Sequence, residues 1–338
     1  MPEYIKYDNH ENEWEKVLND ASRKKIATTW LNQTNSMDRW RHDRMYKLMD
    51  PLIKYNKNFS WLTVGDGRYG TDANALLKLG AKNVMCTDIS DKLLKIGSER
   101  GFINQYSAEN AESMSFEDKN FDFVFCKEAY HHFPRPHIAL HEMLRVAKYG
   151  VILIEPCDPK ITPRLFNRFF PFVKKIRRKI RGRDYDDSEH SFEAVGNYVF
   201  SISERELEKV QLGMHRRYLA FNSVNDYYEP GFEFLSLDTN DPSEQKKINK
   251  AKLSIKRRDR LVKYGLTSPE ILVSILFKSS SFKLFKVSNR HFHALFHLES
   301  NSSLDLIRSS NSLSLLRLSF SPSEFKKSVH LESMFPEI

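Results

Sequence analysis

The sequence predicts an α/β protein built on a doubly wound, mostly parallel sheet. Short apolar runs of strand length alternate with segments of helical periodicity, as in residues 61–64, 73–79 and 83–87. A glycine-rich turn links the first run to the first helical segment, and Asp88 ends the second run. This order of strand, glycine turn, helix, strand and acid is typical of a nucleoside site at the carboxyl ends of parallel strands.

Three glycines form the turn after the first strand: Gly65, Gly67 and Gly70. Glycine lets the backbone approach a ligand closely, and the helix that follows offers free N–H groups at its start. The carboxylate of Asp88 can accept hydrogen bonds from both hydroxyls of a ribose. The spacing also fits a dinucleotide fingerprint, so this stretch alone leaves NAD and other adenosine cofactors open.

The next segment continues the α/β pattern. Residues 121–126 form an apolar strand, preceded by a polar loop that begins at Asn110. Residues 138–146 have the spacing of an amphipathic helix, and residues 150–155 form a buried strand closed by Pro156. The polar and aromatic residues just after the strand 121–126 are Lys127, Glu128, Tyr130, His131 and His132.

With these four motifs in order, the segment 61–156 resembles the class I S-adenosylmethionine (SAM)-dependent methyltransferases, in the group related to ubiquinone-biosynthesis methyltransferases. The resemblance covers a little under a third of the chain and implies a seven-stranded Rossmann-like sheet with SAM as cofactor. The residues implied to contact SAM are Gly65, Asp66, Gly67 and Gly70 at its methionine end, Asp88 at the ribose, Ile89, Asn110 and Ala111 at the adenine, and Lys127 and Glu128 near the sulfonium.

Three positions depart from the usual pattern of that family. The family usually has an acid where Thr63 stands, and its third glycine usually falls where Tyr69 stands, one residue before Gly70. Asn110 replaces a common aspartate and keeps an acceptor for the adenine amine. Because the ribose carboxylate is retained, we expect the cofactor to be SAM.

The residues after the strand 121–126 stand where, in this family, an acceptor meets the methyl group. Methyl transfer from a sulfonium is an in-line displacement, so the protein mainly positions the acceptor. An alcohol acceptor also benefits from a base, and histidine suits that role because its unperturbed pKa is near ~6.5. His131 and His132 are therefore candidate bases, with Glu128 as a further candidate. The alternative is that both histidines line the cleft and pack against the following helix.

Residues 1–58 are predicted to form a helical cap, because apolar residues recur at helical spacing in 14–21 and 40–52. In the resembled family such helices fold over the cofactor cleft. Arg41 and His42, together with Tyr130, are therefore candidate contacts to an anionic substrate, whereas a charged outer helix face is the alternative for the first two.

The net charge of +9 is concentrated in residues 164–183 and 246–263. The first run combines Lys and Arg with phenylalanines, which indicates either a membrane-interface helix or a lid packed on the protein. We therefore expect a small-molecule, sugar or lipid-linked glycan acceptor of anionic character, with peripheral membrane contact through 164–183. No zinc-finger spacing or RNA-recognition signature accompanies the charge, which argues against nucleic acid.

The three cysteines stand in or beside predicted strands without metal-ligand spacing, so we expect buried, reduced thiols and no metal site. The first residues lack the apolar core of a signal peptide, and no run of about eighteen apolar residues occurs. These features favour a cytoplasmic protein, with the peripheral membrane contact described above.

The chain after the basic run 164–183 completes the predicted domain. Ser203, with Glu206 three residues later, is a capping-box start for a helix. A sixth strand follows at 216–224, a basic helix at 247–264 and a seventh strand at 269–277. The resemblance implies that these two strands form the antiparallel pair that closes the sheet.

The sequence divides into three parts: a cap (1–58), a methyltransferase domain (59–278) with a basic insertion at 157–200, and a serine-rich tail (279–338). Disorder, an interaction segment and out-of-frame translation stay open for the tail. We expect a SAM-dependent methyltransferase (EC 2.1.1.-) acting on oxygen, and less readily on nitrogen or carbon. The alternatives are a non-catalytic protein of this fold that binds RNA or a protein through its basic faces, and an NAD-dependent enzyme.

Overall fold

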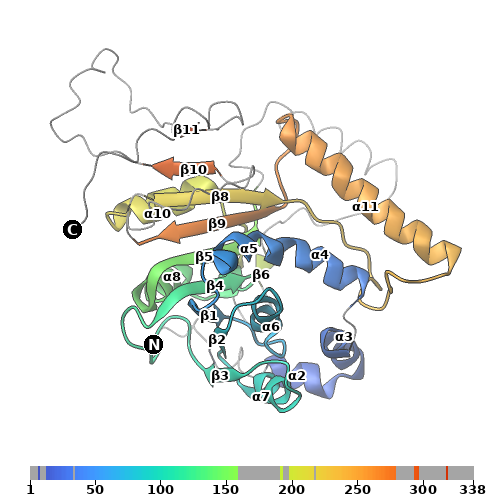
Figure 1. Ribbon diagram of the computed structural model, residues 1–338, viewed down its shortest axis with the longest axis horizontal. Helices are drawn as coiled ribbons and strands as arrows, with labels where there is room; N and C mark the ends of the chain where they lie inside the picture. Colours follow the sequence, from blue (N-terminus) through green and yellow to red (C-terminus); the bar gives the residue numbers. More distant parts are fainter. Residues whose placement is uncertain are drawn as a thin grey trace.

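The computed structural model describes residues 7, 13–32, 35–158, 191–192, 198–216, 218–278, 293–296 and 317–318. One twisted sheet with helices packed on both of its faces forms the body of the protein (Figure 1). The predicted insertion 157–200 lies largely outside the described residues, and this includes the whole basic run 164–183.

Seven strands form the centre of the sheet in the order β3-β2-β1-β4-β5-β9-β8. The neighbours from β3 to β5 pair in parallel, whereas β9 lies antiparallel between β5 and β8. This confirms the predicted seven-stranded, mostly parallel sheet and its antiparallel closing pair. The strands are β1 (Ser60–Val64), β2 (Asn83–Asp88), β3 (Gln105–Ala108), β4 (Phe121–Lys127), β5 (Ala147–Pro156), β8 (Tyr218–Val224) and β9 (Ile271–Phe277).

Two short strands from the segment 279–338 extend the sheet beyond β8. β10 (His293–Phe296) pairs antiparallel with β8, and β11 (Arg317–Leu318) pairs antiparallel with β10. Part of the predicted tail therefore adds to the sheet edge, and the rest lies outside the described residues. A separate antiparallel pair joins β6 (Ser191–Phe192) to β7 (Tyr198–Val199).

The helices precede β1 or connect successive strands. Before β1 come α2 (Glu13–Asn19), α3 (Ala21–Asn32), α4 (Met37–Tyr46), η1 (Lys47–Met49) and α5 (Asp50–Tyr55). Between strands lie α6 (Thr71–Lys78), α7 (Lys92–Glu99), η2 (Tyr130–His132), α8 (Pro136–Val146), α10 (Glu204–Gly213) and α11 (Pro242–Lys263). The Ser203 side chain accepts from the Glu206 N–H at 3.1 Å, which confirms the predicted N-cap of α10.

The basic helix begins earlier than the sequence predicts. The sequence predicts the helix over 247–264, but α11 starts at Pro242. The Asp241 side chain accepts from the Ser243 N–H at 2.7 Å, and proline is favourable in the first turn because it needs no N–H partner there. The acid and the proline together act as a helix start rather than as a turn.

Alternate residues of the central strands face two apolar cores, because side chains along a strand point to opposite faces. Trp61, Phe123 and Phe125 pack on the face covered by α5 and α6. Leu62 and Val124 pack on the other face, which α8 and α10 cover. Since both faces are covered, the central strands are nearly continuous apolar runs. This double burial fixes the strand ends on which the site is built.

The helices before β1 are held to the domain by two smaller contacts. Met37 of α4 packs with Phe232, Leu235 and two α11 residues, and its N–H donates to the Leu235 carbonyl at 2.7 Å. Ala27 of α3 packs with residues around α7. These contacts place α3 and α4 over the carboxyl ends of β1 and β4. Within the described ranges, no helix combines the length and the apolar content needed to cross a bilayer.

Candidate active site

A cavity of about 600 Å³ lies at the carboxyl ends of β1, β2 and β4. Its volume is within the range of pockets that hold cofactor-sized ligands, roughly 300–1,000 Å³. Trp30, His42 and Tyr46 of the N-terminal helices line it opposite the strand ends. The predicted SAM contacts that line the cavity are Gly65, Asp66, Asp88, Ile89, Asn110, Ala111 and Lys127, whereas Gly67 and Gly70 do not line it.

Gly65 forms the floor of the cavity where the backbone leaves β1. It has φ of +75°, and a Cβ built on it would lie 2.4 Å from the Cβ of Ala129. No side chain fits there, so a residue without one keeps the loop after β4 close to the turn after β1. Gly70 also has φ of +75°, but its missing Cβ would meet Ile103 at 2.6 Å. Gly70 therefore serves packing rather than the cavity.

The carboxylate of Asp66 faces the start of α6. It accepts from the N–H groups of Asp72 and Ala73 at 2.9 and 2.8 Å, and from the Thr63 hydroxyl at 3.0 Å. Burial raises the pKa of Asp66, and the nearby Asp72 adds to the rise. The side chain stabilises the turn, which leaves the Asp66 backbone to face the cavity. Thr63, which stands where the family usually has an acid, is buried behind this wall and does not line the cavity.

Tyr69 keeps the backbone conformation expected of a glycine. Its φ is +61°, which L-residues adopt at a cost, and its side chain is 1% exposed. The ring packs with Ala27 of α3 and Leu93 of α7. Burial of the ring therefore holds the tyrosine in the left-handed conformation where the family usually has its third glycine.

The tip of β2 supplies the carboxylate predicted to bind ribose. Asp88 is the last residue of β2 and is 7% exposed, and its Oδ1 accepts from the Ser90 N–H at 3.1 Å. Ile89, Asn110 and Ala111 line the adjoining wall. The Asn110 side chain accepts from the Glu112 N–H at 2.9 Å, which orients its amide. The site thus has an acid beside a wall of one apolar, one amide and one small residue.

Tyr7 closes this end of the cavity and was not predicted. Its hydroxyl donates to Glu112 Oε2 at 2.6 Å and accepts from the Arg135 guanidinium at 2.8 Å. Glu112 also accepts from the Arg135 N–H at 2.8 Å. These three residues are far apart in the chain and belong to no recognisable motif, so only the fold brings them together.

The opposite end of the cavity carries buried charges. Lys127, at the end of β4, pairs with Glu128, and its Nζ lies 5.5 Å from the centre of the Tyr46 ring. Burial opposes ionisation of Glu128, but Lys127 and then His42 outweigh it and lower the pKa to about 2. Glu128 is therefore a fixed carboxylate and a very weak base.

His42 of α4 lies beside this carboxylate. Its Nδ1 is 3.6 Å from Glu128 Oε2, beyond a hydrogen bond, and its Nε2 is 3.8 Å from Asp38 Oδ1. The buried Nδ1 has no hydrogen-bond partner among the described residues, and the ring meets Trp30 edge-on at 4.8 Å. Burial lowers the pKa of His42 well below 6.5, and Lys127 adds to this effect. A neutral imidazole therefore faces the cavity.

Three of the predicted catalytic and substrate residues, Arg41, Tyr130 and His131, also lie outside the cavity lining. The His131 Nδ1 bonds to Glu155, a carboxylate that also accepts from the Tyr130 N–H at 2.9 Å. Tyr130 itself is fully buried. Arg41 pairs with Asp38 and Asp226, so it ties α4 to the segment after β8. His132, the remaining candidate base, lines the cavity.

Within the described ranges, no group of three or more His, Cys, Asp or Glu side chains is placed to hold a metal ion. The fold and the cavity instead define an α/β nucleoside-binding domain. Asp88 stands at the tip of β2 in this cavity, and Lys127 and Glu128 line its end beside β4, the charged chamber.

Comparison with known proteins finds methyltransferases similar to part of this chain. Residues 62–154 match the family model described as a methyltransferase domain. The chain is 33% identical over 95 residues to a demethylmenaquinone methyltransferase of Streptomyces griseus, a match that covers 28% of this chain and 41% of that protein. The chain thus spans about two fifths of the length of this curated relative. The segment 62–154 is therefore similar to methyltransferase domains.

Two solved structures illustrate how far the likeness extends over the chain. A methyltransferase from Bacillus halodurans, described as putative, is 22% identical with a TM-score of 0.39, covering 68% of this chain and 95% of that one. The magnesium protoporphyrin IX methyltransferase of Synechocystis, solved with bound SAH, is 12% identical with a TM-score of 0.42, covering 81% and 94%.

Proposed function

We propose that this protein transfers the methyl group of SAM to an oxygen atom of a small-molecule acceptor. The observation that carries the proposal is the combination of Asp88 at the tip of β2 with the side-chain-free floor at Gly65, which line one cavity from the ends of adjacent strands. The arrangement fits an adenosyl cofactor, because it offers a buried acceptor for ribose hydroxyls and close backbone approach for the methionine end.

Each end of the cavity has a distinct part in holding the cofactor. Asp88 would accept from the ribose hydroxyls, and Ile89 and Asn110 would contact the adenine. The backbone at Gly65 and Asp66 would contact the methionine end, which directs the sulfonium toward Lys127 and Glu128. When bound, SAM supplies an electrophilic methyl group and its own leaving group. The fixed charge of Glu128 favours a cation in this part of the chamber.

An oxygen acceptor must lose its proton, and the structure favours His42 as the group that receives it. Glu128 is paired with Lys127, and His131 is bound to Glu155. His42 Nδ1 is unpartnered among the described residues and unprotonated at neutral pH. The imidazolium formed there would lie 3.6 Å from the Glu128 carboxylate, which would stabilise it. His132 lines the same cavity and would contact the acceptor.

The acceptor is proposed to be anionic or strongly polar. Arg41, the cation predicted for this role, is bound to two carboxylates. Arg68 is the cation proposed for this role instead, because it lines the cavity and its guanidinium lies 5.4 Å from the centre of the Trp30 ring. A sugar hydroxyl or a lipid-linked glycan bearing negative charge fits this combination of a base and a cation.

Calorimetry with SAM, S-adenosylhomocysteine and NADH tests the proposal. We expect the first two to bind and Asp88→Ala to weaken both, since charged hydrogen bonds contribute roughly 1.5–3 kcal/mol each. Asp91→Ala is the matched control, because Asp91 is an exposed acid three residues away whose side chain does not cap α7. Binding of NADH in preference to SAM, or full SAM affinity in Asp88→Ala, would overturn the cofactor assignment.

Comparing metabolites of a deletion strain and its parent addresses the acceptor. The reaction adds one methylene equivalent, a gain of about 14 daltons. We expect a compound in the parent strain whose unmethylated form accumulates in the deletion strain. If SAM binds but no such pair is found, the protein is the non-catalytic alternative.

A further inference from the structure

Helix α11 is a long basic element at one margin of the molecule, where it packs on α4 (Figure 1). It carries nine Lys and Arg residues against only Glu244 and Asp259. One stripe of the helix, Ile248, Ala251 and Ile255, is buried against the domain. The helix is therefore anchored, and its remaining surface faces outward.

The side opposite the buried stripe combines cations with apolar side chains. At 100° per residue, this outer face of α11 includes Lys246, Lys250, Leu253, Arg257, Arg260 and Leu261, and Tyr264 follows as the C-cap. Leu253 is 47% exposed, Leu261 41% and Tyr264 73%. Such large apolar side chains gain nothing from exposure to water, so their grouping on one face marks an interaction site.

Three of the four cations of the outer face are not committed to the protein itself. Lys250 on this face and Arg258 at its flank form ion pairs with Glu229 and Glu270. Within the part of the chain that the structure describes, no ion pair involves Lys246, Arg257 or Arg260. Their charge is thus available to an anionic partner.

We propose that the outer face of α11 docks on an anionic phospholipid surface. Charge complementarity calls for a negative partner, and the leucines select a lipid surface over a nucleic acid. Aliphatic side chains can enter the boundary between headgroups and acyl chains, whereas a phosphate backbone offers them no contact. Tyr264 at the end of the helix suits the same boundary, because its ring is apolar and its hydroxyl is polar.

The docked helix would lie close to the chamber without taking part in it. Ile248 and Ala251 pack with Met37 of α4, and α4 carries His42. A surface bound by α11 therefore lies beside the helices that cover the cavity. This inference concerns where the protein sits, goes beyond the proposed methyl transfer, and is tested without an activity measurement.

Vesicle co-sedimentation tests the proposal, with phosphatidylcholine vesicles that contain or lack phosphatidylserine. We expect the protein to bind only the anionic vesicles and to be released by salt. The variant Lys246→Glu, Arg257→Glu, Arg260→Glu should bind on the order of a hundredfold more weakly, because each cation near such a surface contributes about fivefold.

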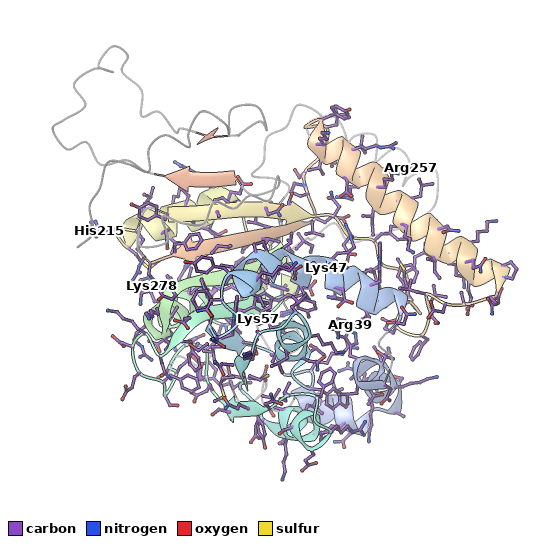
Figure 2. The ribbon with its side chains drawn as sticks, viewed as in Figure 1. Arg39, Lys47, Lys57, His215, Arg257 and Lys278 are labelled. Carbon is purple, nitrogen blue, oxygen red and sulfur yellow. The ribbon has the colours of Figure 1, made fainter. Side chains whose placement is uncertain are left out.

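A second triple variant separates this face from net charge. Lys47→Glu, Lys57→Glu, Lys82→Glu makes the same charge change at exposed positions outside α11, and it should bind vesicles as the unaltered protein does. Figure 2 shows Lys47 and Lys57 near the N-terminal helices and Arg257 on α11. Equal loss in the two triple variants, or full binding by the α11 variant, would overturn the proposal.

The leucines decide between lipid and nucleic acid. Leu253→Asn, Leu261→Asn keeps every charge and should weaken vesicle binding roughly tenfold. It should leave unchanged any binding to a single-stranded oligonucleotide. If the leucine variant binds vesicles normally while an oligonucleotide displaces the protein from them, the face is a nucleic-acid surface instead. Circular dichroism and urea unfolding of each variant confirm that α11 is still folded.

Discussion

Replacing Gly65 with alanine tests whether the floor of the cavity has no room for a side chain. The left-handed backbone costs an alanine about 1–2 kcal/mol. The new Cβ would lie 2.4 Å from that of Ala129, whereas ordinary contacts begin at 3.4 Å, so the two must separate by 1.0 Å (3.4 − 2.4). Ala129 resists, because its N–H donates to the buried Glu155 at 3.2 Å. Overpacking adds about 1–3 kcal/mol, for a total loss of roughly 2–5 kcal/mol.

Gly101→Ala is the matched control. Gly101 has φ of +67°, close to that of Gly65, but no atom lies within 4 Å of its missing Cβ. It should lose only the backbone cost of about 1–2 kcal/mol and bind SAM normally. Gly65→Ala should in addition weaken SAM binding at least tenfold, because the loop that carries Glu128 is pushed away. Urea unfolding and calorimetry measure the two effects. Equal losses of stability and equal SAM affinities in the two variants would refute the reasoning.

Three other substitutions address single contacts. In His42→Gln, the decline in stability as pH falls below 6.5 should be smaller than in the unaltered protein, as urea unfolding at two pH values would show. The reason is that the unfolded chain binds a proton near pH 6.5, whereas burial and Lys127 hold the pKa of folded His42 well below that value. Arg41→Met should lower the free energy of unfolding by about 3–5 kcal/mol, because Asp38 and Asp226 lose their partner. Thermal unfolding measures this loss, and SAM affinity should be retained. A large loss of SAM affinity alone would contradict the prediction. Tyr69→Gly, the change toward the family's residue, should destabilise by about 3 kcal/mol in urea, since the buried ring outweighs the relieved backbone; a more stable variant would show that the ring contributes little.

The sheet was predictable because its strands are buried on both faces and therefore appear as apolar runs. The apolar run 121–126 lies within β4, and Asp88 is the last residue of β2, as the alternation of strand and helix segments in the sequence predicts. The start of α11 was missed because Asp241 and Pro242 are as common in turns as in helix starts. Only the helix that follows them shows which role they take.

The cavity residues that the backbone positions could be predicted from the sequence, whereas the hydrogen-bond partners of the side chains could not. Gly65, Asp88 and Asn110 line the cavity because they end strands or begin the loops after them. His131 lies in η2 and its partner Glu155 lies in β5, 24 positions along the chain, so the sequence neighbours of His131 gave no sign of that contact. Tyr7 likewise reaches Glu112 across 105 positions, a distance over which no local pattern carries information.

The pairing of β10 with β8 bears on how this protein should be shortened for study. A chain that ends at residue 278 would keep all seven central strands, yet the backbone N–H and C=O groups along the outer side of 218–221 would lose their partners. Open strands of this kind recruit strands from other molecules. Self-association and poor yield, rather than lost catalysis, would then be the first symptom of removing the serine-rich end.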